Sequence, residues 1–135
     1  MNPLKIERPL AVFDIEATGT SPQVDRIIDL CVIRLLPNHQ RTLHNFRVNP
    51  GLPIPLESSQ IHGIFDADVA ECPSFKDVAS EILECFEDAD LCGYNLLRFD
   101  IPMLENEFTR AGLTWNSAGA RVVDVQRIYH RKEPR

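Results

Sequence analysis

PLAVFDIE, residues 9–16, is a short run of apolar, β-branched and aromatic residues that ends in two alternating carboxylates. Such a run predicts a buried strand over residues 9–15 whose last residues turn polar. Alternate residues of a strand point to the same face, so the spacing places Asp14 and Glu16 side by side. Two carboxylates this close repel unless a cation lies between them, and hard oxygen ligands suit Mg²⁺ or Mn²⁺. An isolated Asp-x-Glu pair is more often a solvated strand end, but a charge on so apolar a strand needs a reason.

Two further strands are expected near the start of the chain. Alternating and β-branched residues predict strands over residues 26–36 and 42–48, with a turn at residues 37–40 between them. Together with residues 9–15 they form an expected antiparallel meander. An extended connection is expected over residues 50–55.

The hydrophobic period then changes from strand-like to helical. Ser74 and Asp77 form a capping-box pattern, and apolar residues recur at helical spacing as far as Phe86. Downstream we expect, in order, a strand, a helix, a strand and the start of another helix, over residues 90–94, 102–112, 121–125 and from about 125. Strands that alternate with helices after a meander predict an α/β fold, a mixed sheet covered by helices.

Composition limits the function classes. With 135 residues, 44% of them hydrophobic, one domain over residues 1–135 with one core is expected. No apolar run is long enough to span a membrane, and no signal-peptide pattern is present. The four cysteines form no C-x-x-C pair, which favours a reducing cytoplasm. The net charge of −6 argues against an extensive nucleic-acid-binding surface, but not against an enzyme that binds only the end of a strand.

A resemblance to a known family rests on two segments. FDIEATGT, residues 13–20, resembles the first motif of the DEDD 3′→5′ exonuclease superfamily, usually written D-x-E-T-T-G. GYNLLRFDIPML, residues 93–104, resembles the second motif, in which an Asn is followed by Phe-Asp at a helix start. RIIDLCVIRL and the His62-Gly63-Ile64 segment also stand where the family has comparable elements. The chain looks most similar to the DEDDh-type branch with the proofreading subunit of bacterial replicative polymerases.

The resemblance implies a fold and a metal centre. The fold is a ribonuclease H-like mixed five-stranded sheet, with the first three strands antiparallel and helices on its flanks. By the same resemblance, Asp14, Glu16 and Asp100 are the catalytic residues and the ligands of two Mg²⁺ or Mn²⁺ ions. Asp14 would bridge both ions, Glu16 would hold the first and Asp100 the second through water. Taken alone, Asp100 is equally well explained as the N-cap of the following helix.

The resemblance also implies a substrate site at the 3′ end of a strand. Ala17, Thr18 and Gly19 would lie against the terminal nucleotide, with backbone N–H groups and the Thr18 hydroxyl available. The other implied substrate-binding residues are His62, Asn95 and Phe99. Packing in the core is at least as good an explanation for Phe99, and bracing of a loop is an equal one for His62. Ala17 departs from the Thr that is common in the family.

The family's third motif is absent from the sequence. That motif places a His, the general base, and an Asp five residues later on a final helix, and no such pattern occurs here. Asp124 resembles a family position at a strand end and is not taken as the missing ligand. His130 lies too early, and its neighbours Arg127, Arg131 and Lys132 are typical of a solvated basic helix face. We therefore expect a domain that is incomplete at its C-terminal end and lacks its last helices.

Two functions follow as hypotheses. The first is a metal-dependent 3′→5′ exonuclease that releases nucleoside 5′-monophosphates from single-stranded DNA, or from RNA, with a polymerase or another replication or repair protein as a partner. The second is a catalytically silent exonuclease-like module that binds a nucleic acid or a protein. No Gly-rich phosphate loop is present, which argues against a phosphohydrolase of another fold.

Overall fold

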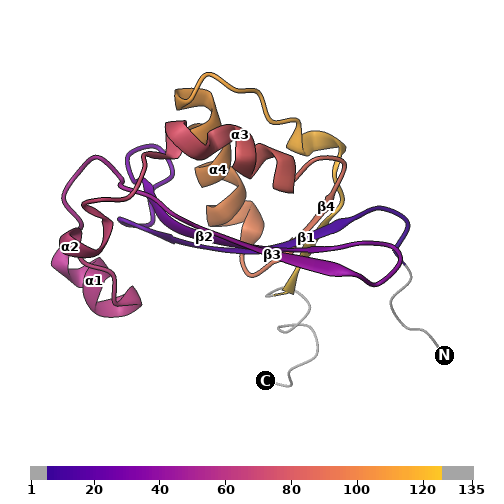
Figure 1. The fold of residues 1–135 in the computed structure, drawn as a ribbon, viewed down its shortest axis with the longest axis horizontal. Helices are drawn as coiled ribbons and strands as arrows, with labels where there is room; N and C mark the ends of the chain where they lie inside the picture. Colours follow the sequence, from indigo (N-terminus) through magenta and orange to yellow (C-terminus); the bar gives the residue numbers. More distant parts are fainter. Residues whose placement is uncertain (1–5, 126–135) are drawn as a thin grey trace.

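A five-stranded mixed sheet forms the centre of the computed structural model, which describes residues 6–125 (Figure 1). The strands are β1 (Leu10–Ala17), β2 (Ile27–Leu35), β3 (Arg41–Arg47), β4 (Asp90–Gly93) and β5 (Val122–Asp124). Their order across the sheet is β3-β2-β1-β4-β5. β1, β2 and β3 pair antiparallel, whereas β1–β4 and β4–β5 are parallel. The predicted meander and the ribonuclease H-like mixed sheet are confirmed.

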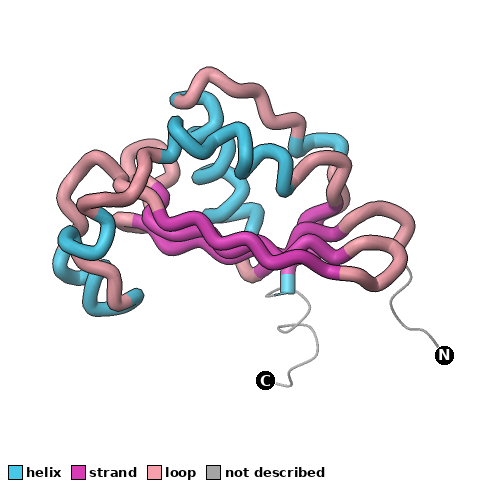
Figure 2. The backbone as a smooth tube through the Cα atoms, viewed as in Figure 1, coloured by secondary structure: helices cyan, strands magenta, loops and turns pink. Residues whose placement is uncertain are grey.

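Four helices accompany the sheet within residues 6–125. They are α1 (Leu56–His62), α2 (Asp66–Val69), α3 (Phe75–Cys85) and α4 (Ile101–Arg110), with a π-helical turn η1 at Leu96–Asp100 and a 3-10 turn η2 at Ser117–Gly119. Helices α3 and α4 cover one face of the sheet, while α1 and α2 lie beyond the end at which β1 finishes (Figures 1 and 2). None of the helices in residues 6–125 has the length and apolar character needed to cross a membrane.

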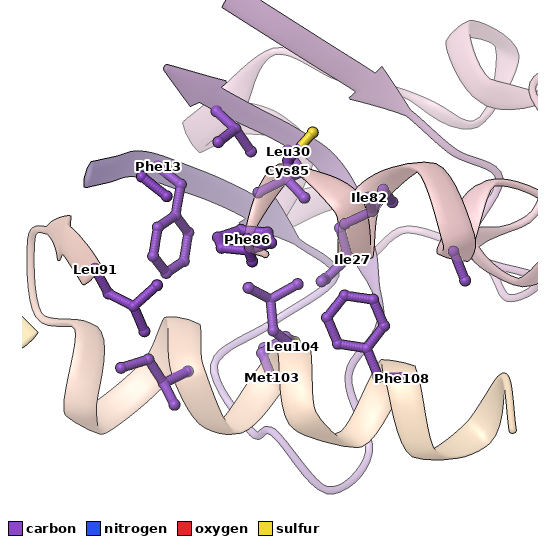
Figure 3. Close-up of a cluster of buried hydrophobic side chains, with 14 of the residues drawn as sticks. Phe13, Ile27, Leu30, Ile82, Cys85, Phe86, Leu91, Met103, Leu104 and Phe108 are labelled. Carbon is purple, nitrogen blue, oxygen red and sulfur yellow. The ribbon is translucent and has the colours of Figure 1, made fainter. Parts of the chain in front are cut away.

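The core lies between the sheet and the two long helices (Figure 3). A chain of aromatic rings joins its parts: Phe13 of β1 contacts Phe86, and Phe86 contacts Trp115. Trp115 in turn contacts Phe108 of α4, which contacts Phe75 of α3. Edge-to-face contacts of this kind add a small directional term to the burial of large apolar area. The sheet and both helices therefore share one core.

The start of α3 follows from its local sequence. The Ser74 hydroxyl accepts a hydrogen bond from the Asp77 amide, and the Asp77 carboxylate accepts one from the Ser74 amide. This reciprocal pair satisfies two helix donors that otherwise have no partner, and it is the predicted capping box.

The other face of the sheet is partly apolar and has no helix over it among residues 6–125 (Figure 1). A row of paired residues crosses all the strands on this face, one from each: Leu43, Ile33, Val12, Cys92 and Val123. Leu43, Ile33 and Val123 are 67%, 37% and 40% exposed. Asp14 and Glu16 lie on the same side of β1 as Val12, because all three alternate along the strand.

Several short elements were not predicted from the sequence. Helices α1 and α2 have seven and four residues, too few for a hydrophobic period to be recognised. Gly63, in the left-handed region with φ 76°, is the stop signal that ends α1. The turn η1 lies between the strand and the helix that were expected over residues 90–94 and 102–112. The helix expected from about residue 125, His130 and its basic neighbours lie outside the described residues.

Replacement of Phe108 tests the shared core. Phe108 is fully buried between Phe75 and Trp115, so Phe108→Ala removes a large apolar side chain and leaves a cavity. We expect the free energy of unfolding to fall by about 3–5 kcal/mol in urea denaturation followed by far-UV circular dichroism. Leu43→Ala, at a position 67% exposed, should change it by less than about 0.5 kcal/mol. Equal losses in the two variants would contradict the assignment of the core.

Candidate functional site

Sheet topology brings the predicted acidic residues to one edge. Asp14 and Glu16 lie near the C-terminal end of β1, and Asp100 ends the η1 turn that follows β4. β1 and β4 are adjacent and parallel, with Val12 opposite Cys92, so their C-terminal ends point in the same direction. The connection that follows β4 therefore starts beside the end of β1, as is usual for sites at the carboxyl edge of parallel strands.

Asp100 is not a helix cap. Its backbone is helical, with φ −68° and ψ −45°, and its side chain makes no capping hydrogen bond to α4. Among the described residues, the carboxylates of Asp14, Glu16 and Asp100 have no hydrogen-bond or ion-pair partner. A carboxylate that is partly buried without a partner carries an unfavourable desolvation cost. Side-chain capping of α4 therefore does not explain the carboxylate at Asp100.

The three carboxylates interact electrostatically. Burial, followed by the charges of Asp14, Glu16 and Asp124, raises the pKa of Asp100 from 3.8 to about 7. Burial and then the Asp14 charge raise the pKa of Glu16, while His62 acts in the opposite direction. Mutual repulsion of this kind is a property of functional carboxylate clusters, although structural clusters also show it.

The donor set suits a hard divalent cation, but the side chains are not closed around one. Carboxylate oxygens are the ligands that Mg²⁺ and Mn²⁺ prefer, and a cation would offset the repulsion that raises the pKa of Asp100. Within residues 6–125, however, no group of three or more His, Cys, Asp or Glu side chains is arranged to hold a metal ion. We conclude that Asp14, Glu16 and Asp100 fit the chemistry of the metal and would have to approach one another to bind it.

A cleft of about 230 Å³ opens beside two of these acids. It is lined by Ile15, Glu16, Ala17, Gly19, Thr20, Ser58, Ile61, His62, Phe99, Asp100 and Met103. Six residues predicted from the sequence therefore meet in one cleft: Glu16, Ala17, Gly19, His62, Phe99 and Asp100. Asp14, Thr18 and Asn95 are not among its lining residues. A larger cleft, of about 530 Å³, lies next to Trp115 and contains none of the predicted residues.

Thr18 differs from its expected role. It is 1% exposed, and its hydroxyl donates to the Asp25 carboxylate and accepts from the Arg26 amide, at 2.9 and 3.0 Å. That hydroxyl was expected to be available to a nucleotide, but it is fully engaged within the protein. The Thr18 carbonyl accepts a 2.7 Å hydrogen bond from the Ser58 hydroxyl, which ties the segment to α1.

His62 braces a loop, one of the two roles that the sequence left open, and it also lines the cleft. Its Nδ1 accepts a hydrogen bond from the Ile64 amide at 3.1 Å, which braces the chain after α1. Because Nδ1 is the acceptor, the neutral ring carries its proton on Nε2. Nε2 is buried and has no partner in the described part of the chain, and His62 lines the cleft. A buried donor of this kind is satisfied by an acceptor on a bound ligand or by an ordered water.

Asp124 holds the connection that carries the second motif. Its two carboxylate oxygens accept hydrogen bonds from the Asn95 and Leu96 amides, at 2.8 and 3.0 Å. Asn95 has φ 59°, a left-handed conformation that Asn tolerates well. Asp124 therefore holds the backbone that leads to Asp100.

The contribution of α1 to the lining of the cleft was not predicted from the sequence. Ser58 and Ile61 face the cleft from this short helix, and Met103 faces it from α4. The only local signal for α1 was the glycine that ends it, because polar and apolar residues show no clear helical period over seven positions.

Comparison with known proteins places the chain in a family. Residues 11–130 match the pattern of the RNase T family, described as exonuclease. The chain is 35% identical over 100 residues to a DNA polymerase III subunit epsilon-like protein of Rhodobacter capsulatus, covering 71% of the chain and 14% of that protein. It is 32% identical over 100 residues to the DNA polymerase III subunit epsilon of Rickettsia prowazekii, covering 73% of the chain and 43% of that protein. The chain spans less than half of the length of these relatives.

Solved structures show the same fold. A structure of exonuclease I matches 93% of the chain with a TM-score of 0.82 at 20% sequence identity, and the match covers 30% of that protein. Exonuclease I of E. coli in complex with a dT13 oligonucleotide matches 93% of the chain with a TM-score of 0.82, also at 20% identity, covering 29% of that protein. At this identity the likeness concerns the fold alone.

The raised pKa of Asp100 predicts that the free energy of unfolding depends on pH. Between 3.8 and about 7 the folded protein holds a proton on Asp100 that the unfolded chain has lost, so stability falls as pH rises through this window. Asp100→Asn should raise the free energy of unfolding by roughly 2 kcal/mol at about pH 8 without metal, and by much less at about pH 4. The measurement is urea denaturation at both pH values. Asp88→Asn, which removes an exposed charge, should show no such difference; a similar difference there would contradict the assignment.

Proposed function

Since this chain belongs to the RNase T exonuclease family of the DEDD type, we propose that it is a metal-dependent 3′→5′ exonuclease. The observation that carries the proposal is the convergence of Asp14, Glu16 and Asp100, whose carboxylates have no hydrogen-bond or ion-pair partner among the described residues, and of which Glu16 and Asp100 line a cleft. In a folded protein such charges persist against their desolvation cost when a ligand compensates for them.

The proposed roles follow from the position of each acid. Asp14 and Glu16 project from adjacent same-side positions of one strand, and Asp100 approaches from the start of α4. A pair of Mg²⁺ or Mn²⁺ ions, when bound, supplies water activation and stabilises the leaving oxygen of the phosphodiester. Asp14, Glu16 and Asp100 would hold these ions, with Asp14 as the proposed shared ligand. Deprotonation of Asp100 is then required for binding, which favours neutral to alkaline pH.

The cleft supplies the proposed nucleotide site. Ile61, Phe99 and Met103 offer apolar surface to a base and sugar, while Glu16 and Asp100 lie toward the metal end. The unpartnered Nε2–H of His62 is a donor for an oxygen of the terminal nucleotide. A single strand end fits an acidic protein better than a duplex does, because few phosphates need to be neutralised.

We favour DNA as the substrate and replication or repair as the setting. The support is the similarity to subunits of DNA polymerase III and to exonuclease I, which has been solved with a DNA oligonucleotide and in the complex ExoI/SSB-Ct. A polymerase or another replication protein in the cytoplasm is the proposed partner. RNA is the competing substrate, because no residue of the cleft plainly reads a 2′-hydroxyl.

A catalytically silent module is the second candidate. One observation favours it: residues 1–135 contain no His-x-x-x-x-Asp pattern. A general base contributes roughly 10²–10⁴-fold to such reactions. The 135-residue chain alone is therefore expected to show little or no turnover, and the coding sequence downstream of Arg135 distinguishes the two candidates. A His-x-x-x-x-Asp pattern there favours the enzyme.

Activity of the full-length protein tests the proposal directly. It should shorten a 5′-labelled single strand from its 3′ end only when Mg²⁺ or Mn²⁺ is present. Asp14→Ala should lower the rate by on the order of 10³-fold or more, because the shared metal ligand is lost. Denaturing gel electrophoresis of the products measures both effects.

Asp88→Asn is the matched control, because it removes an acidic charge remote from the cleft residues and should retain full activity. Cleavage that survives chelation of divalent cations, or an Asp14→Ala variant as active as the wild type, would refute the metal-dependent mechanism. A full-length protein that binds single strands but never cleaves them supports the silent module.

A further inference from the structure

The connection between β1 and β2, residues 18–26, is closed by its own polar groups. The Thr18 amide donates to the Arg26 carbonyl at 2.9 Å, at the base of the connection. One oxygen of the Asp25 carboxylate accepts from the Thr18 hydroxyl, and the other accepts from the Ser21 amide at 2.8 Å. A side chain at Gly19 would collide with this carboxylate, since an added Cβ would lie 2.4 Å from an Asp25 oxygen. The connection is therefore a defined structure.

Helix α4 holds this connection at several points. Asn106 donates to the Pro22 carbonyl at 2.7 Å, and Arg110 donates to the Gln23 carbonyl at 2.8 Å. Between them on the same helix, Glu107 accepts from the Arg26 guanidinium and from the Ile27 amide, both at 2.9 Å. Glu107 also accepts from Arg110 at 3.3 Å.

Glu107 is the centre of this attachment. It is 1% exposed, and glutamate is almost never so buried unless it is paired. Its two oxygens accept from Arg26, Ile27 and Arg110, so the burial cost is offset only while all these groups stay in place. Hydrogen bonds to a buried charge depend steeply on geometry, so they define one position of the connection relative to α4.

The two segments joined in this way both contribute residues to the lining of the cleft. Gly19 and Thr20 line it from the connection, whereas Phe99 and Asp100 line it from η1, directly before α4, and Met103 lines it from the first turn of α4. The same helix thus carries Asp100 at one end and fixes the segment after Glu16 through its other end. A shift of the connection along α4 would change the width of the cleft without altering any residue that lines it.

We propose that Glu107, together with Arg26 and Arg110, positions the Gly19–Thr20 wall and thereby sets the affinity of the cleft for the terminal nucleotide. These are positioning residues, since none of them lines the cleft. The ligand named here rests on the proposed function, whereas the attachment itself rests on the hydrogen bonds alone.

The test compares Glu107→Gln and Arg110→Ala with Arg34→Ala. Arg34 donates to the carbonyls of Glu84 and Cys85 in the last turn of α3 and of Glu87 just after it, so its loss removes a comparable number of polar contacts away from the cleft. Amide hydrogen exchange at Ser21, Asp25 and Ile27 reports the attachment. Titration calorimetry with thymidine 5′-monophosphate and Mn²⁺ reports the cleft.

Glu107→Gln and Arg110→Ala should accelerate exchange at these amides and weaken binding of the nucleotide by roughly tenfold, while Arg34→Ala changes neither. Arg110→Lys, which keeps a donor toward Gln23, should restore part of the affinity. Unchanged nucleotide affinity despite faster exchange would overturn the positioning role, as would an equal loss in Arg34→Ala. If the wild type binds no nucleotide, the proposed function fails, and unaccelerated exchange in Glu107→Gln would independently overturn the attachment.

Discussion

The parallel pairing of β1 with β4 governs the arrangement of the site. Because Val12 lies opposite Cys92, the chain leaves both strands at the same edge of the sheet. The acids at the end of β1 and the acid after β4 are therefore neighbours although more than 80 residues separate them in the sequence. An antiparallel pairing of the same strands would place them at opposite edges. Every electrostatic property of the site depends on this register.

The polar network around the site divides into two kinds of carboxylate. Asp25, Glu107 and Asp124 are saturated by backbone amides, hydroxyls or arginines, and they hold segments in place. Asp14 and Asp100 have no such partner within residues 6–125, and the pKa of Asp100 is correspondingly raised. The carboxylates with partners hold the segments that line the cleft without lining it themselves, whereas Glu16 and Asp100, which lack partners among the described residues, do line it. This division is the physical basis for separating positioning residues from candidate ligands.

The local sequence was sufficient to predict much of the fold. The meander, the capping box at Ser74 and the main span of α4 were predicted because each depends on residues close in the chain. Helix α1 was not predicted, since its seven residues gain their stability from packing and from the ties of Ser58 and His62. For the same reason the role of Thr18 was misjudged. Its hydroxyl is satisfied by Asp25 and Arg26, a pairing that exists only once the connection has closed.

The sequence by itself determined the class of fold and the identity of the acids, because strand alternation and the two motifs are short-range patterns. Only the tertiary structure decided which acids remain unpaired and which serve as supports. Glu107 illustrates the difference: along the sequence it is one more charge on an amphipathic helix, yet it is buried. Its partners Arg26 and Ile27 are about 80 residues away, and hydrogen bonds across such a separation are specified by packing and register.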